Sequence, residues 1–307
     1  MILAIIVLVF VLIVVGILVY MEYGVPYIPI SPFRKLEMTL PSAFGLGFKR
    51  LRVRGAMGVI LRGYFIPALT AKARATIVVL HGNGSSKETY FGFARWLTEQ
   101  GFNAVIYDQR AHGHSGGKYC TFGYYEKQDV SKVISKILKK YSQLPIGIHG
   151  TSMGGAVALQ ALAIEKRLTF GIVESTFNTL ENVIEEYGRD MFKFRSRWLI
   201  RRILSRAAVI ANFKPFDIKP VESCRHIEQP MLLIHGDADE KIPIAFNRDN
   251  FQALKTSDKT FYTVKGAGHE DVWAIGGAEY EKKLLDFLNR CVHLPKNEAV
   301  IANEQSE

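Results

Sequence analysis

Cysteine and clustered metal ligands are scarce in this sequence. The three cysteines, Cys120, Cys224 and Cys291, are spread through 307 residues and form no obvious disulfide framework. No internal repeat is visible, nor any grouping of histidine, cysteine and carboxylate residues at the spacing of a metal site. We therefore expect no metal or other cofactor, and the cysteine usage favours a reducing compartment.

Charge is absent from the amino-terminal stretch Ile2–Tyr20, which is almost wholly aliphatic. As a helix this stretch would span about 28 Å, close to the hydrocarbon core of a bilayer. A cleaved signal peptide would need a basic region before a shorter apolar run and a small-residue cleavage site after it, and the sequence has neither. A buried core helix of this length would carry a polar face. We therefore expect residues 1–21 to form a transmembrane anchor.

The segment that follows, residues 22–45, is rich in proline and predicts an extended spacer between the anchor and the rest of the chain. Its prolines are Pro26, Pro29, Pro32 and Pro41. Basic residues follow the apolar stretch and none precedes it, which favours a cytoplasmic location for the following domain. The nearest of them are Arg34, Lys35, Lys49 and Arg50.

Residues 46–293 have the length of one domain with a large core. Short apolar runs alternate with amphipathic helical stretches, which predicts an α/β domain with a mostly parallel central sheet and helices on both faces. The clearest helical stretches are 87–100, 126–141 and 279–290. Residues 51–66 predict an antiparallel hairpin at the sheet edge, and residues 294–307 form a polar tail.

More than fifty residues separate the strand candidates 170–174 and 231–235, too many for a simple crossover. We expect a helical cap inserted at about 176–221, with an amphipathic helix over 195–210. Its apolar face holds Leu199, Ile200, Ile203, Leu204, Ala207 and Ile210, and its basic face holds Arg195, Arg197, Arg201, Arg202 and Arg206.

Two interpretations of this basic face remain open. The helix is either a lid whose arginines face water, or a surface that contacts anionic lipid headgroups. The net charge of +10 is consistent with an anionic neighbour. Nucleic acid is disfavoured as a partner because no recognisable binding motif accompanies the basic residues.

A G-x-S-x-G pentapeptide occupies residues 150–154, after the apolar run 144–149 and before a helix-forming stretch. A serine on a sharp strand-to-helix turn needs glycine neighbours, which leave room for the turn and for a substrate above it. The alternative is an ordinary glycine-rich turn. The strand before and the helix after favour Ser152 as a nucleophile.

A nucleophilic serine requires a base and an acid that orients it. His269 lies in a glycine-rich loop just after the strand candidate 260–264, where it can reach the sheet edge. Asp237, Asp239 and Glu240 all follow the strand candidate 231–235, and turn capping accounts equally well for two of them. The residues alone leave the acid open among these three.

An oxyanion hole needs backbone N–H groups directed at the developing alkoxide. One is expected from Met153, the residue after the nucleophile. The other is expected from Asn83, in the glycine-containing loop 81–86 that follows the strand candidate 75–80. His81 is expected to order this loop rather than to transfer protons.

Taken together, these segments resemble the alpha/beta-hydrolase superfamily, in its branch of monoacylglycerol-lipase-like and serine-aminopeptidase-like serine hydrolases. The matching segments are His81–Gly84, Asp108–Ser115, Gly150–Gly155, His235–Pro243 and Gly268–His269. The resemblance covers about residues 50–292. It implies the alpha/beta-hydrolase fold and selects Asp239 as the acid, leaving Asp237 as a loop residue. Ala111 stands in a structural turn where many members carry glycine.

The predicted activity is hydrolysis of carboxylic esters, with an acyl or lipid-like substrate, by Ser152, His269 and Asp239. A peptidase or thioesterase remains the main alternative, because acyl transfer to water uses the same machinery and only the pocket differs. A catalytically silent, membrane-anchored scaffold that binds through the cap is a third possibility. Relatives with an aspartate nucleophile are disfavoured, since the turn carries serine.

Overall fold

A computed structural model describes residues 2–192 and 196–293 of the chain. The predicted polar tail 294–307 and the cap residue Arg195 lie outside the described residues.

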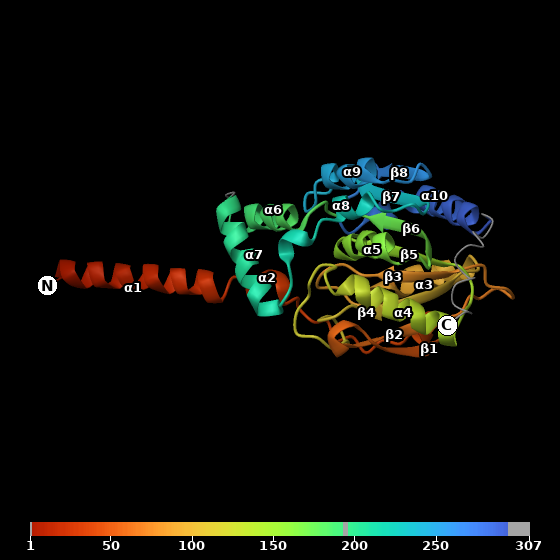
Figure 1. Ribbon diagram of the computed structural model, residues 1–307, viewed down its shortest axis with the longest axis horizontal. Helices are drawn as coiled ribbons and strands as arrows, with labels where there is room; N and C mark the ends of the chain where they lie inside the picture. Colours follow the sequence, from red (N-terminus) through yellow and green to blue (C-terminus); the bar gives the residue numbers. More distant parts are fainter. Residues whose placement is uncertain (1, 193–195, 294–307) are drawn as a thin grey trace, which may run out of the picture.

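A twisted eight-stranded sheet forms the centre of the molecule (Figure 1). Its strand order is β1-β2-β4-β3-β5-β6-β7-β8, with β1 and β2 antiparallel to their neighbours and the other strands parallel. The strands are β1 (Lys49–Arg54), β2 (Ile60–Ile66), β3 (Thr76–Leu80), β4 (Asn103–Asp108), β5 (Ile146–Thr151), β6 (Leu168–Glu174), β7 (Met231–Gly236) and β8 (Lys259–Val264). The predicted mostly parallel sheet with an antiparallel hairpin at its edge is confirmed.

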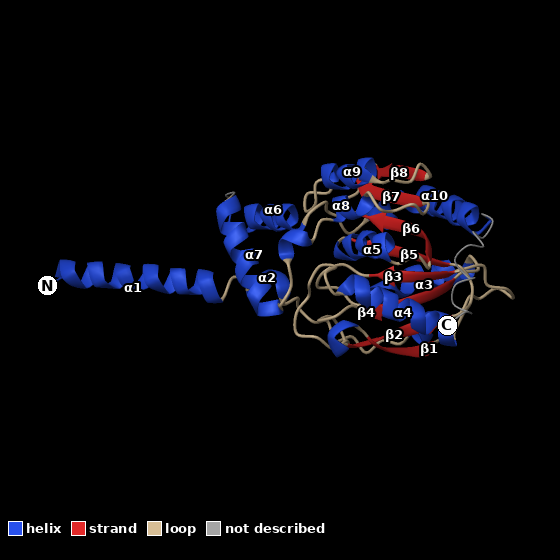
Figure 2. Cartoon of the chain, viewed as in Figure 1, coloured by secondary structure: helices blue, strands red, loops and turns tan. Residues whose placement is uncertain are grey.

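Helices cover both faces of this sheet (Figure 2). One face packs on α4 (Glu126–Lys140), α5 (Met153–Ile164), α8 (Pro220–Cys224) and α9 (Ile244–Ala253). The other face packs on α3 (Phe91–Glu99), which a 3-10 turn (Lys87–Tyr90) precedes, and on α10 (Val272–His293). Alternate residues of β3 enter the two cores, as the period of two in a strand requires: Val78 faces one helix layer and Ile77 the other.

The long connection from β6 to β7 holds α6 (Leu180–Phe192), α7 (Arg197–Ala211) and a 3-10 turn (Pro215–Asp217). The helices α6 and α7, with Phe213 and Ile218 on either side of the 3-10 turn, share a third apolar core with the start of α5. Within α7, Ile200, Leu204 and Ala207 are buried in this core, while the arginines of the helix lie on other sides. The inserted segment therefore sits at the end of the sheet where β5, β6 and β7 finish.

The amino-terminal helix α1 (Ile2–Tyr23) buries none of its side chains and projects away from the domain (Figure 1). It is long and apolar enough to cross a membrane. Its exposed aliphatic surface would be costly in water, because apolar area is expelled from water roughly in proportion to its size.

The proline-containing segment differs from the expected extended spacer, because it packs on the domain. A short helix α2 (Tyr27–Ile30) follows α1, and Ile30 is buried in the cap core. The carbonyl oxygen of Ile30 accepts a 2.9 Å hydrogen bond from the Cys120 N–H. Arg34 donates to the carbonyl oxygens of Ser115, at 2.7 Å, and Gly117. Between these prolines Ile30 is buried, whereas most other apolar side chains, such as Phe33 and Met38, are exposed. The segment is therefore held to the domain by Ile30 and these hydrogen bonds.

Candidate active site

Ser152 lies at the sharp turn between β5 and α5, with φ 56° and ψ −120°. Few non-glycine residues adopt a positive φ, so the surrounding structure must hold this conformation. The Ser152 N–H donates to the Glu174 carbonyl oxygen at 2.9 Å, and the Thr176 hydroxyl donates to the Ser152 carbonyl oxygen at 2.7 Å. Glu174 is the last residue of β6 and Thr176 lies just beyond it, so the end of the neighbouring strand and the loop after it stabilise the strained turn.

The glycines of the pentapeptide are required by close backbone contacts. A Cβ atom on Gly154 would lie 2.3 Å from the Leu80 carbonyl oxygen, and one on Gly150 would lie 2.2 Å from the Gly154 carbonyl oxygen. Helix α5 therefore leaves the sheet against the main chain of β3, which presents Ser152 above the strand ends.

Ser152, His269 and Asp239 meet at this edge of the sheet. The His269 Nε2 atom lies 3.0 Å from the Ser152 Oγ, and the His269 Nδ1 atom lies 2.7 Å from the Asp239 Oδ2. With Nδ1 protonated and donating to the carboxylate, Nε2 is left free to accept the serine proton. The arrangement has the hydrogen-bond pattern of a nucleophile, a base and an orienting acid.

Asp239 is held as a carboxylate by its surroundings. Burial alone would raise the pKa of Asp239, but hydrogen bonds from His235 and His269 and the charge of His269 hold it well below its usual range. The Oδ2 atom lies 3.2 Å from the His235 Nε2, and the Oδ1 atom accepts the N–H groups of Lys241 and Ile242 at 3.0 and 2.8 Å. These contacts fix the orientation of the acid toward His269.

The other two candidate acids point elsewhere. Asp237 accepts the Gly266 N–H at 2.6 Å in an exposed turn, and Glu240 is exposed to solvent. Of the three carboxylates that the residues alone left open, Asp239 is the one in contact with His269.

The loop after β3 passes directly beside the nucleophile. A Cβ atom on Gly82 would lie 3.4 Å from the Ser152 Cβ, so Asn83 follows within reach of the same site. His81 orders this loop: its Nε2 accepts the Gln109 N–H at 2.9 Å, and its Nδ1 lies 2.8 Å from the Gly82 carbonyl oxygen. Burial lowers the pKa of His81 to about 3, so the ring is neutral in this role. Met153 is buried as the first residue of α5.

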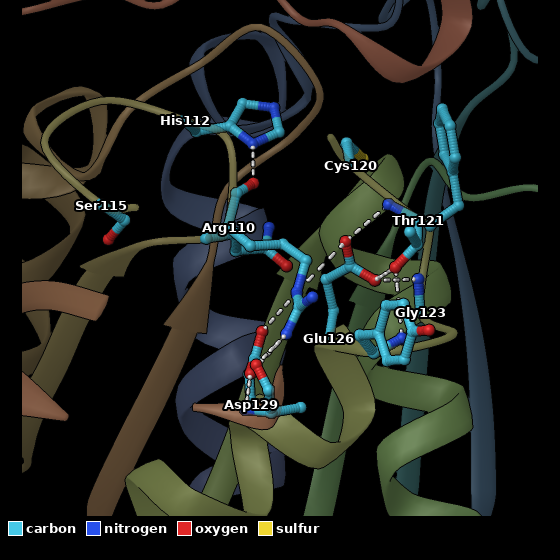
Figure 3. Close-up of polar contacts among 12 residues, drawn as sticks. Arg110, His112, Ser115, Cys120, Thr121, Gly123, Glu126 and Asp129 are labelled. Atoms are coloured by element: carbon cyan, nitrogen blue, oxygen red, sulfur yellow. Dashed lines mark hydrogen bonds and ion pairs between the residues drawn. The ribbon is translucent and has the colours of Figure 1, made fainter. Parts of the chain in front are cut away.

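A buried network anchors the loop after β4 (Figure 3). Arg110 binds the Asp129 carboxylate at 2.8 Å, and Glu126 of the same helix accepts the Thr121 N–H at 2.7 Å. The His112 Nε2 reaches the Asn83 side-chain oxygen at 3.2 Å. The His112 Nδ1 faces the Arg110 carbonyl oxygen at 2.9 Å and must donate a proton to it. The Nε2 atom of the neutral ring is therefore an acceptor. The Asn83 amide is accordingly oriented with its NH₂ group toward the ring.

The turn within this loop explains one departure noted in the sequence. Ala111 adopts a left-handed backbone with φ 63° and is fully buried. A glycine would take this conformation without strain, and alanine takes it because its N–H is bonded to the Gly116 carbonyl oxygen at 2.9 Å.

Several contacts in the site carry no sequence signal. Tyr187 of α6 approaches Ser152 and Asp239 from the cap, and burial, followed by the charge of Asp239, raises its pKa to about 12. His235 contacts Asp239, and the Tyr280 hydroxyl donates to the buried Glu174 carboxylate at 2.8 Å. From the sequence, a tyrosine in an amphipathic cap helix is expected to lie in the core. Its approach to the nucleophile is decided by how the cap packs on the domain.

Within residues 2–192 and 196–293, no group of three or more histidine, cysteine or carboxylate side chains is placed to hold a metal ion. The three cysteines are free and buried, and none contacts Ser152 in the described part of the chain.

Comparison with known proteins supports membership of the alpha/beta-hydrolase superfamily. Residues 71–215 match the family described as "Serine aminopeptidase, S33". The "Uncharacterized protein YqkD" of Bacillus subtilis is 27% identical over 264 residues, which cover 84% of this chain and 81% of that protein. The "Alpha/beta hydrolase domain-containing protein WAV2" of Arabidopsis thaliana is 24% identical over 290 residues, covering 90% of each chain.

Among solved structures, the Pyrococcus furiosus esterase Pf2001 superimposes with a TM-score of 0.72. The two sequences are 24% identical, and the match covers 85% of this chain and 97% of the esterase. At this identity the likeness shows a shared fold.

Proposed function

Because the chain belongs to the alpha/beta-hydrolase superfamily, we propose that it is a membrane-anchored serine hydrolase that cleaves carboxylic esters of acyl or lipid-like substrates. The observation that carries the proposal is the chain of contacts from Ser152 through His269 to Asp239, at 3.0 and 2.7 Å. A serine hydroxyl is activated at neutral pH when a base accepts its proton and an acid orients that base, which is the pattern of these three residues.

In the proposed reaction, the Ser152 Oγ attacks the ester carbonyl carbon while His269 Nε2 takes the hydroxyl proton. The tetrahedral alkoxide then collapses, the bond to the alcohol breaks, and His269 returns the proton to the departing alkoxide oxygen. Water attacks the resulting acyl-serine by the same sequence, with His269 again as base, and releases the acid. Asp239 stays ionised throughout and stabilises the imidazolium that forms twice per turnover.

The backbone N–H groups of Met153 and Asn83 are the proposed donors to the alkoxide. Met153 begins α5, so the positive end of that helix dipole adds to the stabilisation. His112 would act on this hole indirectly, because it holds the side chain of Asn83.

Attachment to a membrane is proposed from α1, whose exposed aliphatic surface suits hydrocarbon better than water. The basic residues after it favour a cytoplasmic hydrolase domain. An acyl substrate is favoured because such an enzyme would work beside a lipid phase. The Pyrococcus furiosus esterase shares this fold, so the fold is compatible with ester hydrolysis.

A fluorophosphonate probe tests the nucleophile. We expect the full chain to be labelled, and Ser152→Ala to lose labelling and to lose ester hydrolysis by about 10⁴-fold or more. Ser205→Ala, at an exposed serine of α7, is the matched control and should keep both. A wild-type chain that is not labelled would indicate a catalytically silent scaffold, and a labelled Ser152→Ala would remove Ser152 from the mechanism.

A peptidase is the second candidate, because the matched family is described as a serine aminopeptidase. Comparison of p-nitrophenyl esters of increasing chain length with aminoacyl p-nitroanilides separates the two. An esterase should give the higher kcat/KM on the esters and an optimum at some chain length, whereas an aminopeptidase should prefer the amides that carry a free amino group. A thioesterase would instead prefer acyl thioesters of the same chain lengths.

A further inference from the structure

The outward side of α7 carries a stripe of exposed side chains opposite its buried side. Trp198 is 72% exposed and Val209 is 74% exposed, although both are apolar. The two residues lie about three helical turns apart on one line of the helix, with the exposed Ser205 between them. Leu204 and Ala207, on the opposite side, are fully buried in the cap core. This helix therefore has apolar side chains on both its inner and its outer side.

The end of α1 meets this outward side. Glu22, in the last turn of α1, binds Arg202 and Arg206 of α7, each at 2.9 Å. The Arg206 guanidinium also lies over the Tyr23 ring, 5.4 Å from its centroid. Figure 1 shows α7 crossing the carboxyl end of α1 rather than continuing its direction. The ion pairs thus place the outer stripe of α7 at the level where α1 ends.

The arginines of α7 retain positive charge after these contacts. Two of them share the Glu22 carboxylate, and Arg197 and Arg201 share the Glu181 carboxylate at 2.9 and 2.8 Å. Each group of two cations and one anion keeps a net charge of +1. The guanidinium groups are partly exposed, so N–H donors remain for a phosphate oxygen.

We propose that α7 lies in the headgroup region of the membrane that α1 spans, with Trp198 and Val209 directed toward the acyl chains and the arginines at lipid phosphates. This inference rests on the proposed membrane anchoring of the chain. Exposed apolar side chains next to cations are the composition of a helix that lies in the plane of an interface. Tyr20 and Tyr23, exposed at the end of α1, place further aromatic rings at the same level, where tyrosine and tryptophan are enriched.

A helix held at the membrane surface would also set the orientation of the active site. The core that buries the inner side of α7 includes Met153 and Ala156, which begin the helix behind Ser152. The carboxyl edge of the sheet, with the nucleophile, would then face the bilayer. An ester would reach Ser152 from the lipid phase, so the favoured substrate is a membrane lipid with an acyl chain rather than a water-soluble ester.

Site-specific probes in the full chain test this arrangement. The natural cysteines are all buried, so an environment-sensitive thiol probe should label an introduced cysteine selectively. Val209→Cys reports on the outer stripe of α7. Ile164→Cys is the matched control, an aliphatic residue that is 52% exposed at the far end of α5. Val11→Cys, within α1, reports on insertion of the anchor.

Each labelled protein is placed in nanodiscs of phosphatidylcholine and phosphatidylglycerol, with and without lipids that carry a spin label near the headgroup. We expect blue-shifted emission at position 209 and quenching at least about twofold stronger than at position 164. Blue-shifted emission at position 11 with water-like emission at position 209 would overturn the placement of α7 and leave the anchor intact. Water-like emission at position 11 would overturn both. Neither result depends on catalysis, so it stays separate from the test of Ser152.

Discussion

At Asp239, three hydrogen-bond donors and the ring of His235 surround one carboxylate whose side chain is fully buried. Two backbone N–H groups bind Oδ1, and His235 and His269 both face Oδ2. A carboxylate held in this way cannot rotate toward solvent, so it also fixes the ring of His269. His235 is thus a positioning residue, because it reaches the reacting atoms only through Asp239.

Asparagine substitutions test the assignment of the acid. Asp239→Asn should lower kcat/KM on an ester by about 10⁴-fold, the size of effect known for the equivalent change in a serine-protease triad, because the amide favours the wrong imidazole tautomer. Asp237→Asn, at the exposed turn residue of the same loop, is the matched control and should keep most of the activity. Ester kinetics on the two variants decide the matter, and a larger loss at Asp237 would show that the acid has been misassigned.

His149 is a buried histidine that the proposed reaction does not use. Its ring packs 4.6 Å from Phe93, and neither ring nitrogen has a hydrogen-bond partner in the described structure. Burial lowers the pKa of His149 to about 3. Below pH 6.5 the unfolded chain takes up a proton at this ring, while the folded chain does not. The free energy of unfolding is therefore unaffected by protonation of His149 above pH 6.5 and falls progressively as the pH is lowered to about 3.

His149→Phe should therefore reduce the acid sensitivity of the fold. By linkage, the wild type should lose about 2 kcal/mol of unfolding free energy between pH 7 and pH 5 through this residue alone. Urea unfolding of the full chain in mild detergent at the two pH values measures the difference, and any constant packing cost of the phenyl ring cancels. His226→Phe, at an exposed position, should leave the pH dependence unchanged. An equal pH dependence in His149→Phe and wild type would show that the folded ring is protonated too.

At the scale of elements, the contact between α5 and β3 decides where the nucleophile is presented. Gly154 allows the helix to pass against the main chain of Leu80 and His81, since a Cβ atom would lie 2.3 Å from the Leu80 carbonyl oxygen. Backbone atoms cannot move aside as a flexible side chain can. The first turn of α5, the adjoining Ser152 and the Gly82 loop are thus positioned by one close approach.

Gly154→Ala should push α5 away from β3 and displace Ser152 from His269. We expect activity to fall by about 10²-fold or more, because misplacement by about 1 Å has effects of this size, and the melting temperature to fall as well. Gly92→Ala, in α3, is the control, since its nearest neighbour lies 4.0 Å from the added Cβ atom and alanine favours a helix. Ester kinetics and thermal unfolding of both variants measure the two effects. Unchanged activity in Gly154→Ala would show that the turn between β5 and α5 tolerates the added methyl group.

At the scale of the whole molecule, helix α1 and the hydrolase domain meet through few contacts. None of the side chains of α1 is buried, whereas Val25 and Ile30 just beyond it are buried. The boundary between the segment proposed to lie in the membrane and the segment that packs in the domain core therefore falls near Glu22. The domain core is complete without the preceding residues.

Removal of residues 1–21 should release the protein from the membrane fraction without unfolding it. We expect the rate on a short soluble ester to stay within about twofold of the full chain, because the lost helix contributes no core packing. The rate on a long-chain ester dispersed in vesicles should fall, because substrate and enzyme no longer share a phase. Fractionation and the two assays check this, and a collapse of the short-ester rate would show that α1 supports the catalytic fold.

The sequence alone predicts several features of this protein, and particular residues show why. The sequence predicts the sharp turn at Ser152 because a G-x-S-x-G between a strand and a helix is a local pattern. It predicts α1 because nineteen uncharged residues follow one another. The mostly parallel sheet followed from alternating apolar runs. These features depend on neighbours in the chain, and backbone sterics and hydrophobic periodicity act over that range.

Other features depended on contacts between distant residues, and only the tertiary structure decided them. The sequence left Asp237, Asp239 and Glu240 equivalent until the resemblance favoured one, and the approach of Asp239 to His269 depends on how two loops meet. Tyr187 reaches Ser152 only because the cap docks over the strand ends. Arg202 and Arg206 of α7, which the sequence placed on a solvent or lipid face, share Glu22, 180 positions away from Arg202. Such pairs are set by packing of whole elements, which no local pattern encodes.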